Sequence, residues 1–149
     1  MRRLLILVAT LISVISFHPA TAGETFSGTW EIDLRSKAEK IKNIECGTAI
    51  FELSQNGVQI VGSHSMATSG CGRINEGGEG TVKGVVIGQT AVLVITSGRN
   101  GAIVMGTAKL IKNALEWTTL DEIKAGDLNG DSALILDKGM LSKKLQKSD

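Results

Sequence analysis

Aromatic residues and proline are scarce in this chain. Its 149 residues include no tyrosine, three phenylalanines, two tryptophans and one proline. Transmembrane β-barrels of the outer-membrane type carry girdles of aromatic side chains at both interfaces, so this composition argues against that class. The one proline, Pro19, lies near the N-terminus, which leaves the rest of the chain free of the residue that interrupts sheets. Eighteen glycines favour many short strands joined by tight turns.

An excess of charge of either sign is also absent. The chain has 16 Lys and Arg against 15 Asp and Glu, and without Arg2 and Arg3 the 14 remaining basic residues leave a net charge of −1. Nucleic-acid-binding domains gather positive charge on one surface, and anionic membranes attract polybasic segments. We therefore expect neither nucleic acid nor a membrane surface as a partner.

The N-terminal segment has the pattern of an export signal. Arg2 and Arg3 precede an apolar run from Leu4 to Phe17, and Ala20-Thr21-Ala22 follows as a small-residue cleavage site. A run of about fourteen residues fits the apolar core of a signal peptide, whereas a transmembrane helix needs roughly 20. An uncleaved membrane anchor is the alternative. The pattern predicts a periplasmic or secreted protein that has no membrane attachment after cleavage.

The signal pattern also divides the chain. Residues 1–22 are expected to be the signal peptide, residues 23–141 a single domain, and residues 142–149 a polar C-terminal tail. The length after cleavage suits one domain with its own core.

Strand-like segments alternate with turn signals over the rest of the chain. The predicted strands span residues 26–33, 48–54, 58–66, 81–87, 90–96, 102–111, 114–123 and 133–137. The connector 34–45 can hold a short helix over residues 36–44, and residues 68–80 are expected to form a glycine-rich loop. Sequential antiparallel hairpins close most simply as an up-and-down barrel, which removes both sheet edges. We predict an all-β, eight-stranded antiparallel barrel, with a β-sandwich as the alternative.

Two turns predict which side chains face inward. With Asn56-Gly57 as a two-residue turn, the expected inward pairs are Leu53 with Ile60, Phe51 with Gly62 and Ala49 with His64. With Lys112-Asn113 as the other turn, Lys109 lies opposite Glu116 on the outside. The further inward set is Val82, Val86, Leu93, Ile95, Val104, Ala108, Leu110, Leu115, Trp117 and Thr119.

The same alternation leaves an apolar outer surface. Its residues are Val85, Ile87, Val92, Val94, Ile103 and Met105. Soluble monomers rarely expose more than a few hundred Å² of contiguous apolar area, so something is expected to cover this surface. A homodimer through Val85, Val92, Val94, Ile103 and Met105 is one possibility. Coverage by the connector helix or by the C-terminal segment is the other.

Cys46 and Cys71 are the only cysteines. They bracket the first predicted hairpin of an exported chain, so we predict a disulfide worth roughly 3 kcal/mol. With His64 they supply only three candidate zinc ligands, and no paired C-x-x-C occurs. We therefore expect no metal and no cofactor.

Four residues are candidate ligand contacts. His64, the only histidine after cleavage, can serve as a polar contact in the barrel mouth or bond a loop carbonyl or water at the rim. Trp117 can stack on a ligand ring or fill the core. Arg73 and Arg99, both in predicted loops, can clamp a carboxylate or remain solvated. No G-x-S-x-G elbow accompanies the lone histidine, so we expect no enzymatic activity.

Two segments resemble calycin-like barrels, the group that contains lipocalins and avidins. Phe26-Ser27-Gly28-Thr29-Trp30-Glu31 resembles their first-strand G-x-W signature, and the run from Phe51 to Gly62 is similar to a second hairpin of such exported barrels. The resemblance implies that Trp30 plugs one end of the barrel and that ligands enter at the other. The T-D-Y motif of lipocalins and the ligand-facing aromatic set of avidins are absent, so biotin binding is not implied.

A second resemblance is to periplasmic lysozyme inhibitors. These small disulfide-bearing barrels present a Ser-Gly loop to the enzyme cleft, and Ser97-Gly98-Arg99 stands in a predicted hairpin turn here. The aromatic residue expected beside that loop is absent.

The sequence thus leads to two functional hypotheses. The first is an exported, non-enzymatic β-barrel that binds a small apolar or amphipathic ligand in a lumen where Gly62, Gly84, Gly106 and Ala108 leave space. The alternative is a periplasmic protein-interaction module, such as a lysozyme-inhibitor-like protein, that acts through residues 97–101.

Overall fold

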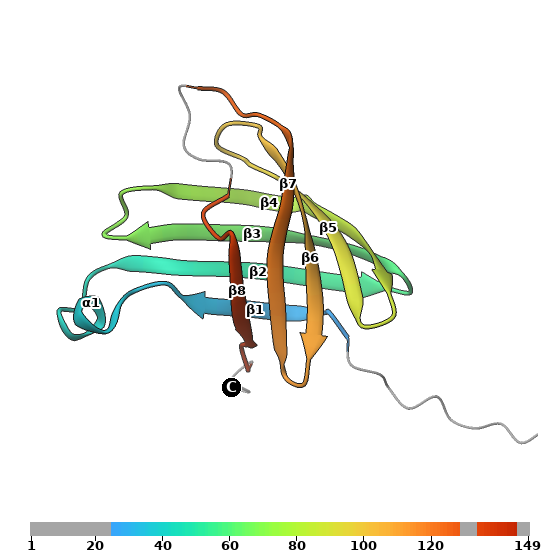
Figure 1. Ribbon diagram of the computed structural model, residues 1–149, viewed down its shortest axis with the longest axis horizontal. Coiled ribbons are helices and arrows are strands. Elements are labelled where there is room, and N and C mark those ends of the chain that lie inside the picture. Colours follow the sequence, from blue (N-terminus) through green and yellow to red (C-terminus); the bar gives the residue numbers. More distant parts are fainter. Residues whose placement is uncertain (1–24, 129–133, 146–149) are drawn as a thin grey trace, which may run out of the picture.

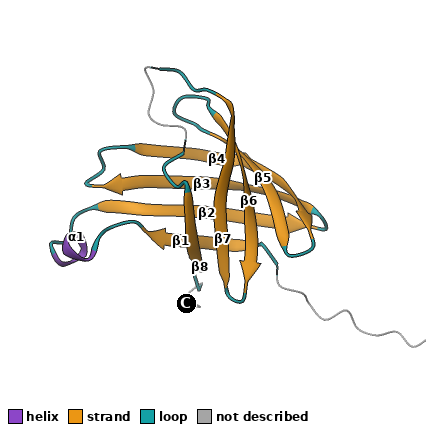
Figure 2. Cartoon of the chain, viewed as in Figure 1, coloured by secondary structure: helices purple, strands orange, loops and turns teal. Residues whose placement is uncertain are grey.

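Eight strands and one short helix make up the part of the chain that the computed structural model describes, residues 25–128 and 134–145 (Figure 2). They are β1 (Gly28–Asp33), α1 (Lys37–Ile41), β2 (Cys46–Asn56), β3 (Gln59–Ser69), β4 (Ile74–Ile87), β5 (Thr90–Thr96), β6 (Ile103–Ile111), β7 (Ala114–Lys124) and β8 (Lys138–Lys143). The predicted signal peptide, residues 1–22, lies outside the described residues.

The strands form a closed antiparallel barrel. Each strand pairs with its neighbours in sequence, and β1 pairs with β8 to complete the circle (Figure 1). Trp30 pairs with Lys143 and Glu31 with Ser142 at this closing seam. The predicted up-and-down barrel is therefore confirmed, in place of the sandwich. Within the described residues, no helix is long and apolar enough to span a membrane.

The predicted loop 68–80 is wrong. β3 continues to Ser69 and β4 begins at Ile74, so most of this glycine-rich stretch is paired strand. The register between β3 and β4 shifts between Gly62 and His64, and Gly80 adopts a φ of +82° in the same region. A bulge of this kind favours glycine because it can need a positive φ. The glycines therefore serve an irregular strand and do not form a free loop.

The predicted last strand, residues 133–137, is also wrong. β8 runs from Lys138 to Lys143. The first two residues of the predicted tail 142–149 are therefore the last two residues of this strand. The side chain of Leu136 is buried in the core although its backbone is not in a strand, and Leu134 and Ile135 pack against that core. The apolar run is thus used to cover the barrel end. Residues 129–133 and 146–149 lie outside the described part.

The first predicted register is displaced by two residues. Asn56 pairs with Gln59, so the turn is Gly57-Val58, and Gly57 has a φ of +59°. A type II′ turn places glycine at this first central position. The observed pairs are Leu53 with Gly62, Phe51 with His64 and Ala49 with Met66. A shift of two residues keeps each side chain on its predicted face. The register of Lys109 opposite Glu116 is confirmed.

The two ends of the barrel differ. One end, here the hairpin end, carries the tight turns Gly57-Val58, Gly88-Gln89 and Lys112-Asn113. The opposite end, here the loop end, carries residues 34–45, 70–73, 97–102, 125–128 and 134–137. The predicted disulfide between Cys46 and Cys71 lies at the loop end, where it joins the start of β2 to the turn after β3. A disulfide indicates an oxidising environment.

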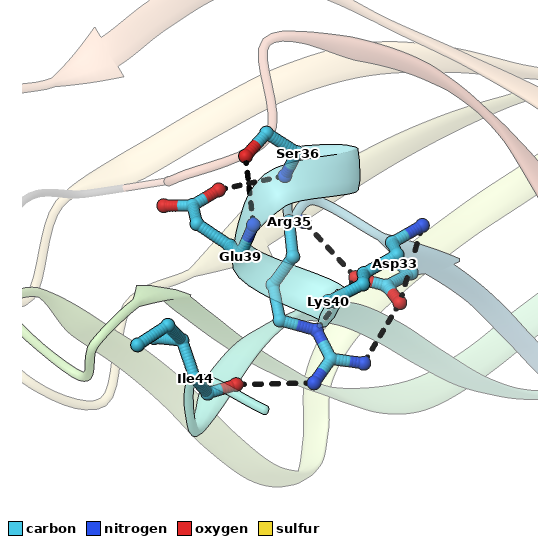
Figure 3. Close-up of polar contacts among 6 residues, drawn as sticks. All are labelled: Asp33, Arg35, Ser36, Glu39, Lys40 and Ile44. Carbon is cyan, nitrogen blue, oxygen red and sulfur yellow. Dashed lines mark hydrogen bonds and ion pairs between the residues drawn. The ribbon is translucent and has the colours of Figure 1, made fainter. Parts of the chain in front are cut away.

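A network of ion pairs and hydrogen bonds attaches α1 to the loop end (Figure 3). Arg35 donates from Nε and Nη2 to the Asp33 carboxylate at 3.0 and 2.9 Å, and from Nη1 to the carbonyl of Ile44 at 3.1 Å. These contacts hold the pKa of Asp33 far below its usual range. Ser36 and Glu39 form a capping box, and the Ser36 contacts lower the pKa of Glu39. A five-residue helix is thereby fixed to the barrel without burying any of its side chains.

Replacing both cysteines (Cys46→Ser with Cys71→Ser) is expected to lower the free energy of unfolding by about 3 kcal/mol, because the unfolded chain regains the freedom of a 25-residue loop. Urea denaturation followed by tryptophan fluorescence measures the difference. The wild-type protein in reducing buffer should match the variant. A loss of under about 1 kcal/mol would contradict a stabilising disulfide.

Candidate functional site

The barrel lumen is filled by side chains. The inward apolar side chains of no measurable exposure are Ala49, Phe51, Val82, Ala91, Leu93, Ala108, Leu115, Trp117 and Leu141. They come from strands all around the barrel, and no water-sized space lies against them. The lumen at their level is a packed core of the kind found in small eight-stranded barrels.

The inward glycines do not leave the space expected of them. A Cβ on Gly106 would overlap the Trp117 indole, and one on Gly84 would overlap Leu93 and the Val92 carbonyl. A Cβ on Gly62 would meet the carbonyl of Glu52 and the side chain of Leu53. At each of these glycines, a neighbouring residue occupies the space that a side chain would need. The expectation that Gly62, Gly84, Gly106 and Ala108 open a cavity is wrong.

Trp117 belongs to this packed interior. Its ring lies 5.2 Å from the Phe51 ring, centroid to centroid, and its Nε1 donates to the Leu136 carbonyl at 3.1 Å. The Thr119 hydroxyl is a second acceptor at 3.2 Å. With no exposed surface, the indole is not available to stack on a ligand. Of the two predicted roles for Trp117, the structure places it in the core.

His64 lies in a buried polar cluster inside the barrel. Its Nδ1 is 3.3 Å from the Thr81 hydroxyl, and its Nε2 is 3.3 Å from Asn75 Oδ1. Ser97 donates to the same Asn75 oxygen at 3.0 Å. His64, Asn75 and Ser97 are 2%, 0% and 4% exposed, respectively. We call these three residues and Thr81 the polar cluster.

Burial lowers the pKa of His64, while the Asn75 contact and the charge of Glu76 oppose that change. The imidazole is therefore neutral at neutral pH, with one donor and one acceptor nitrogen. Asn75 Nδ2 is buried without a hydrogen-bond partner in the described part of the chain, as is Ser69 Oγ. Such groups cost stability, so the polar cluster is held in place by the packing around it.

The polar cluster is hydrogen-bonded to the 97–101 loop from the barrel interior. Ser97 Oγ accepts hydrogen bonds from the backbone N–H groups of Arg99 and Asn100, each at 3.2 Å. The Gly98 N–H donates to the Glu76 carbonyl at 2.8 Å, and a Cβ on Gly98 would overlap that carbonyl. Asn100 Oδ1 accepts from the Ala102 N–H at 3.1 Å. The loop is therefore a fixed structure, although Gly98 and Arg99 are exposed.

The two candidate arginines differ in their surroundings. Arg99 Nη2 lies 3.0 Å from Glu76 Oε1, and the side chains are 40% and 56% exposed. Arg73 is exposed in the turn between β3 and β4, where its backbone N–H and C=O contact Thr68. The four candidate ligand residues thus do not converge, because Trp117 and His64 are buried and the arginines lie on the surface.

Two adjoining hollows, with volumes of about 610 and 530 Å³, lie along β1–β4. Both are bordered by Glu52, Ser63 and Glu79, and the second also by Glu76 and His64. Their acidic walls favour a cationic group. No group of histidine, cysteine or carboxylate residues within the described ranges is arranged to hold a metal ion.

Nucleophilic catalysis needs a base within hydrogen-bond reach of the nucleophile. Ser97 and His64 both contact Asn75, which separates them, and all three are shielded from solvent. Asn75 and Glu76 are not among the predicted site residues, because the sequence predicts a loop over the stretch 68–80. Its assignment as a strand would have placed Asn75 on the inward face beside His64.

No protein-family model, curated protein sequence or solved structure matches this chain. A function therefore has to be inferred from its own residues.

Trp117→Ala is expected to lower the free energy of unfolding by about 3–5 kcal/mol, because it empties a large volume in a packed core. Leu120→Ala, on the same strand but 56% exposed, is the control and should change stability by less than about 0.5 kcal/mol. Urea denaturation measures both variants. If Trp117→Ala lost as little unfolding free energy as Leu120→Ala, the lumen would be open.

His64 is expected to make the fold less stable in mild acid. Its lowered pKa means that the unfolded chain binds the proton more readily, so the His64 contribution is full above the ordinary pKa of 6.5 and declines below it. Urea midpoints at pH 7.5 and at pH 5.5 should differ less in His64→Gln than in the wild type. The same pH dependence in both proteins would rule out this assignment.

Proposed function

We propose that the protein is an exported, non-enzymatic binding module that recognises another protein through the 97–101 loop. The observation that supports this most directly is the hydrogen bonding of that loop to Glu76 and to the polar cluster. A loop that is rigid before binding loses little conformational entropy when a partner docks. Recognition elements on preorganised loops gain affinity for that reason.

Export is supported by two independent features. The N-terminal sequence has the layout of a cleavable signal, and the Cys46–Cys71 disulfide is typical of oxidising compartments. We place the protein in the periplasm or outside the cell.

We further propose that the barrel is calycin-like. Trp30, in the Gly28-Thr29-Trp30 segment of β1, is 2% exposed, and its Nε1 donates to the Phe26 carbonyl at 2.8 Å. The Lys143 ammonium group from β8 lies 5.2 Å from the centre of its ring. A tryptophan buried under a cation at the closing seam supports the resemblance of this segment to the G-x-W signature.

The chemistry of the loop suggests the class of partner. Arg99 presents a guanidinium with donors beyond the one that Glu76 engages, and guanidinium groups bind carboxylates in a forked geometry. Glycoside hydrolases that cut polysaccharides carry a pair of carboxyl groups in an open cleft. A cleft of this kind is suited to an exposed arginine on a narrow loop. The partner we propose is a lysozyme-like glycosidase, in keeping with the resemblance to periplasmic lysozyme inhibitors.

A small apolar ligand in the lumen is the competing function. The filled interior favours recognition at the outer surface instead, because the described inward side chains leave no accessible space around Trp117 and Phe51.

The proposal is tested with a turbidity assay in which purified muramidases of different classes lyse a peptidoglycan suspension. The wild-type protein should inhibit at least one class, and Arg99→Ala should raise the inhibitory concentration by at least about tenfold, as for loss of a central interface arginine.

Arg73→Ala is the matched control, since it removes the same charge from another exposed turn at the loop end. It should inhibit like the wild type. Full inhibition by Arg99→Ala would contradict the assigned loop, and no inhibition of any muramidase by the wild type would contradict the proposed partner.

A further inference from the structure

A continuous apolar surface covers the outside of β4, β5 and β6. We call it the apolar face, and its residues are Val85, Ile87, Val92, Val94, Ile103 and Met105. Val85 and Ile87 are 48% and 70% exposed, and the other four are partly exposed. Neighbouring Val61 is 42% exposed, and it borders a hollow of about 500 Å³ together with Val85, Val92 and Val94.

As far as residue 145, neither segment expected as an internal cover reaches the apolar face. α1 lies beside the ends of β1 and β2, on the far side of the barrel from β5 and β6 (Figure 1). β8 is paired between β7 and β1, and the chain after it stays against β1, where the Lys144 N–H donates to the Thr29 carbonyl. The described residues therefore leave this surface open to another molecule.

Two opposite charges flank the centre of the apolar face in one cross-strand row. Lys83 pairs with Val94, Val94 with Met105, and Met105 with Asp121. Both charged residues are exposed, and neither forms an ion pair within the described residues. At the usual spacing of strands they stand roughly 14 Å apart.

We propose that a second copy of this chain covers the apolar face, related by a two-fold axis that runs along the strands between β5 and β6. Rotation about that axis exchanges the two sides of the row. Lys83 of each copy then faces Asp121 of the other, and Val94 of each copy faces Met105 of the other. A two-fold interface uses the same patch on both subunits, so a surface with this arrangement is complementary to itself.

The neighbouring rows fit the same arrangement. Val85, Val92, Thr107 and Thr118 form the next row, which contains no charge. The row beyond it consists of Ile87, Thr90, Lys109 and Glu116. There the axis places Lys109 of one copy against Thr90 of the other, and Ile87 of one copy against Glu116 of the other. No two like charges in these rows are brought together. The centre of the contact is apolar and its ionic contacts lie at the sides, as in stable interfaces.

The mutual position of Lys83 and Asp121 allows a charge-swap experiment on the mature chain. Sedimentation velocity over about 1–100 μM should show a wild-type dimer, in the usual affinity range of weak to moderate interfaces. Asp121→Lys and Lys83→Asp should each weaken dimerisation at least tenfold, because each brings like charges together. The double variant, which exchanges the two charges, should restore the dimer.

Glu52→Lys is the control, since it makes the same charge reversal on an exposed residue of β2 away from the apolar face. It should dimerise like the wild type, and circular dichroism should show all variants folded. A monomeric wild type at the highest concentration would overturn the proposal. A double variant that dimerises no better than either single variant would also overturn it, as would a different protein or a lipid copurifying on this face.

Discussion

The packing of Trp117 inside the closed barrel is the constraint on which the rest of the structure depends. Its indole occupies the position that a side chain at residue 106 would need, contacts the Phe51 ring, and donates to the carbonyl of Leu136. One side chain thereby joins β6, β2 and the segment that covers the loop end. With the lumen occupied in this way, the interior supplies stability, and the function that we propose uses the outer surface.

The buried polar cluster connects that interior to the surface. Burial keeps His64 neutral, and Asn75 links it to Ser97, which in turn holds the N–H groups of Arg99 and Asn100. The shape of the 97–101 loop is therefore set from within the barrel. In the proposed dimer the two-fold axis runs along the strands, so both loops would lie at the same end of the assembly. Two such loops on one side would increase the avidity for a surface that offers paired sites.

Local patterns in the sequence predicted the barrel well where side chains alternate. The inward and outward faces of β2–β7 follow from period-two hydrophobicity, and Lys109 opposite Glu116 follows from a single turn. Predictions failed where tertiary packing overrides the local signal. Gly77, Gly78 and Gly80 indicated a loop but serve a bulged strand, and the apolar run at 134–136 indicated a strand but covers the core. Glycines on the inward face indicated space, whereas only the fold could show that Trp117 and Leu93 occupy it.

Native mass spectrometry of the protein purified from its own source tests the solid interior most directly. We expect the mass of the processed chain, two hydrogens lighter for the disulfide, as a monomer or an exact multiple of it with no added small molecule. A stoichiometric small-molecule adduct that survives gentle ionisation and is released on unfolding would contradict it, because such a molecule would need the space that Trp117 and its neighbours fill.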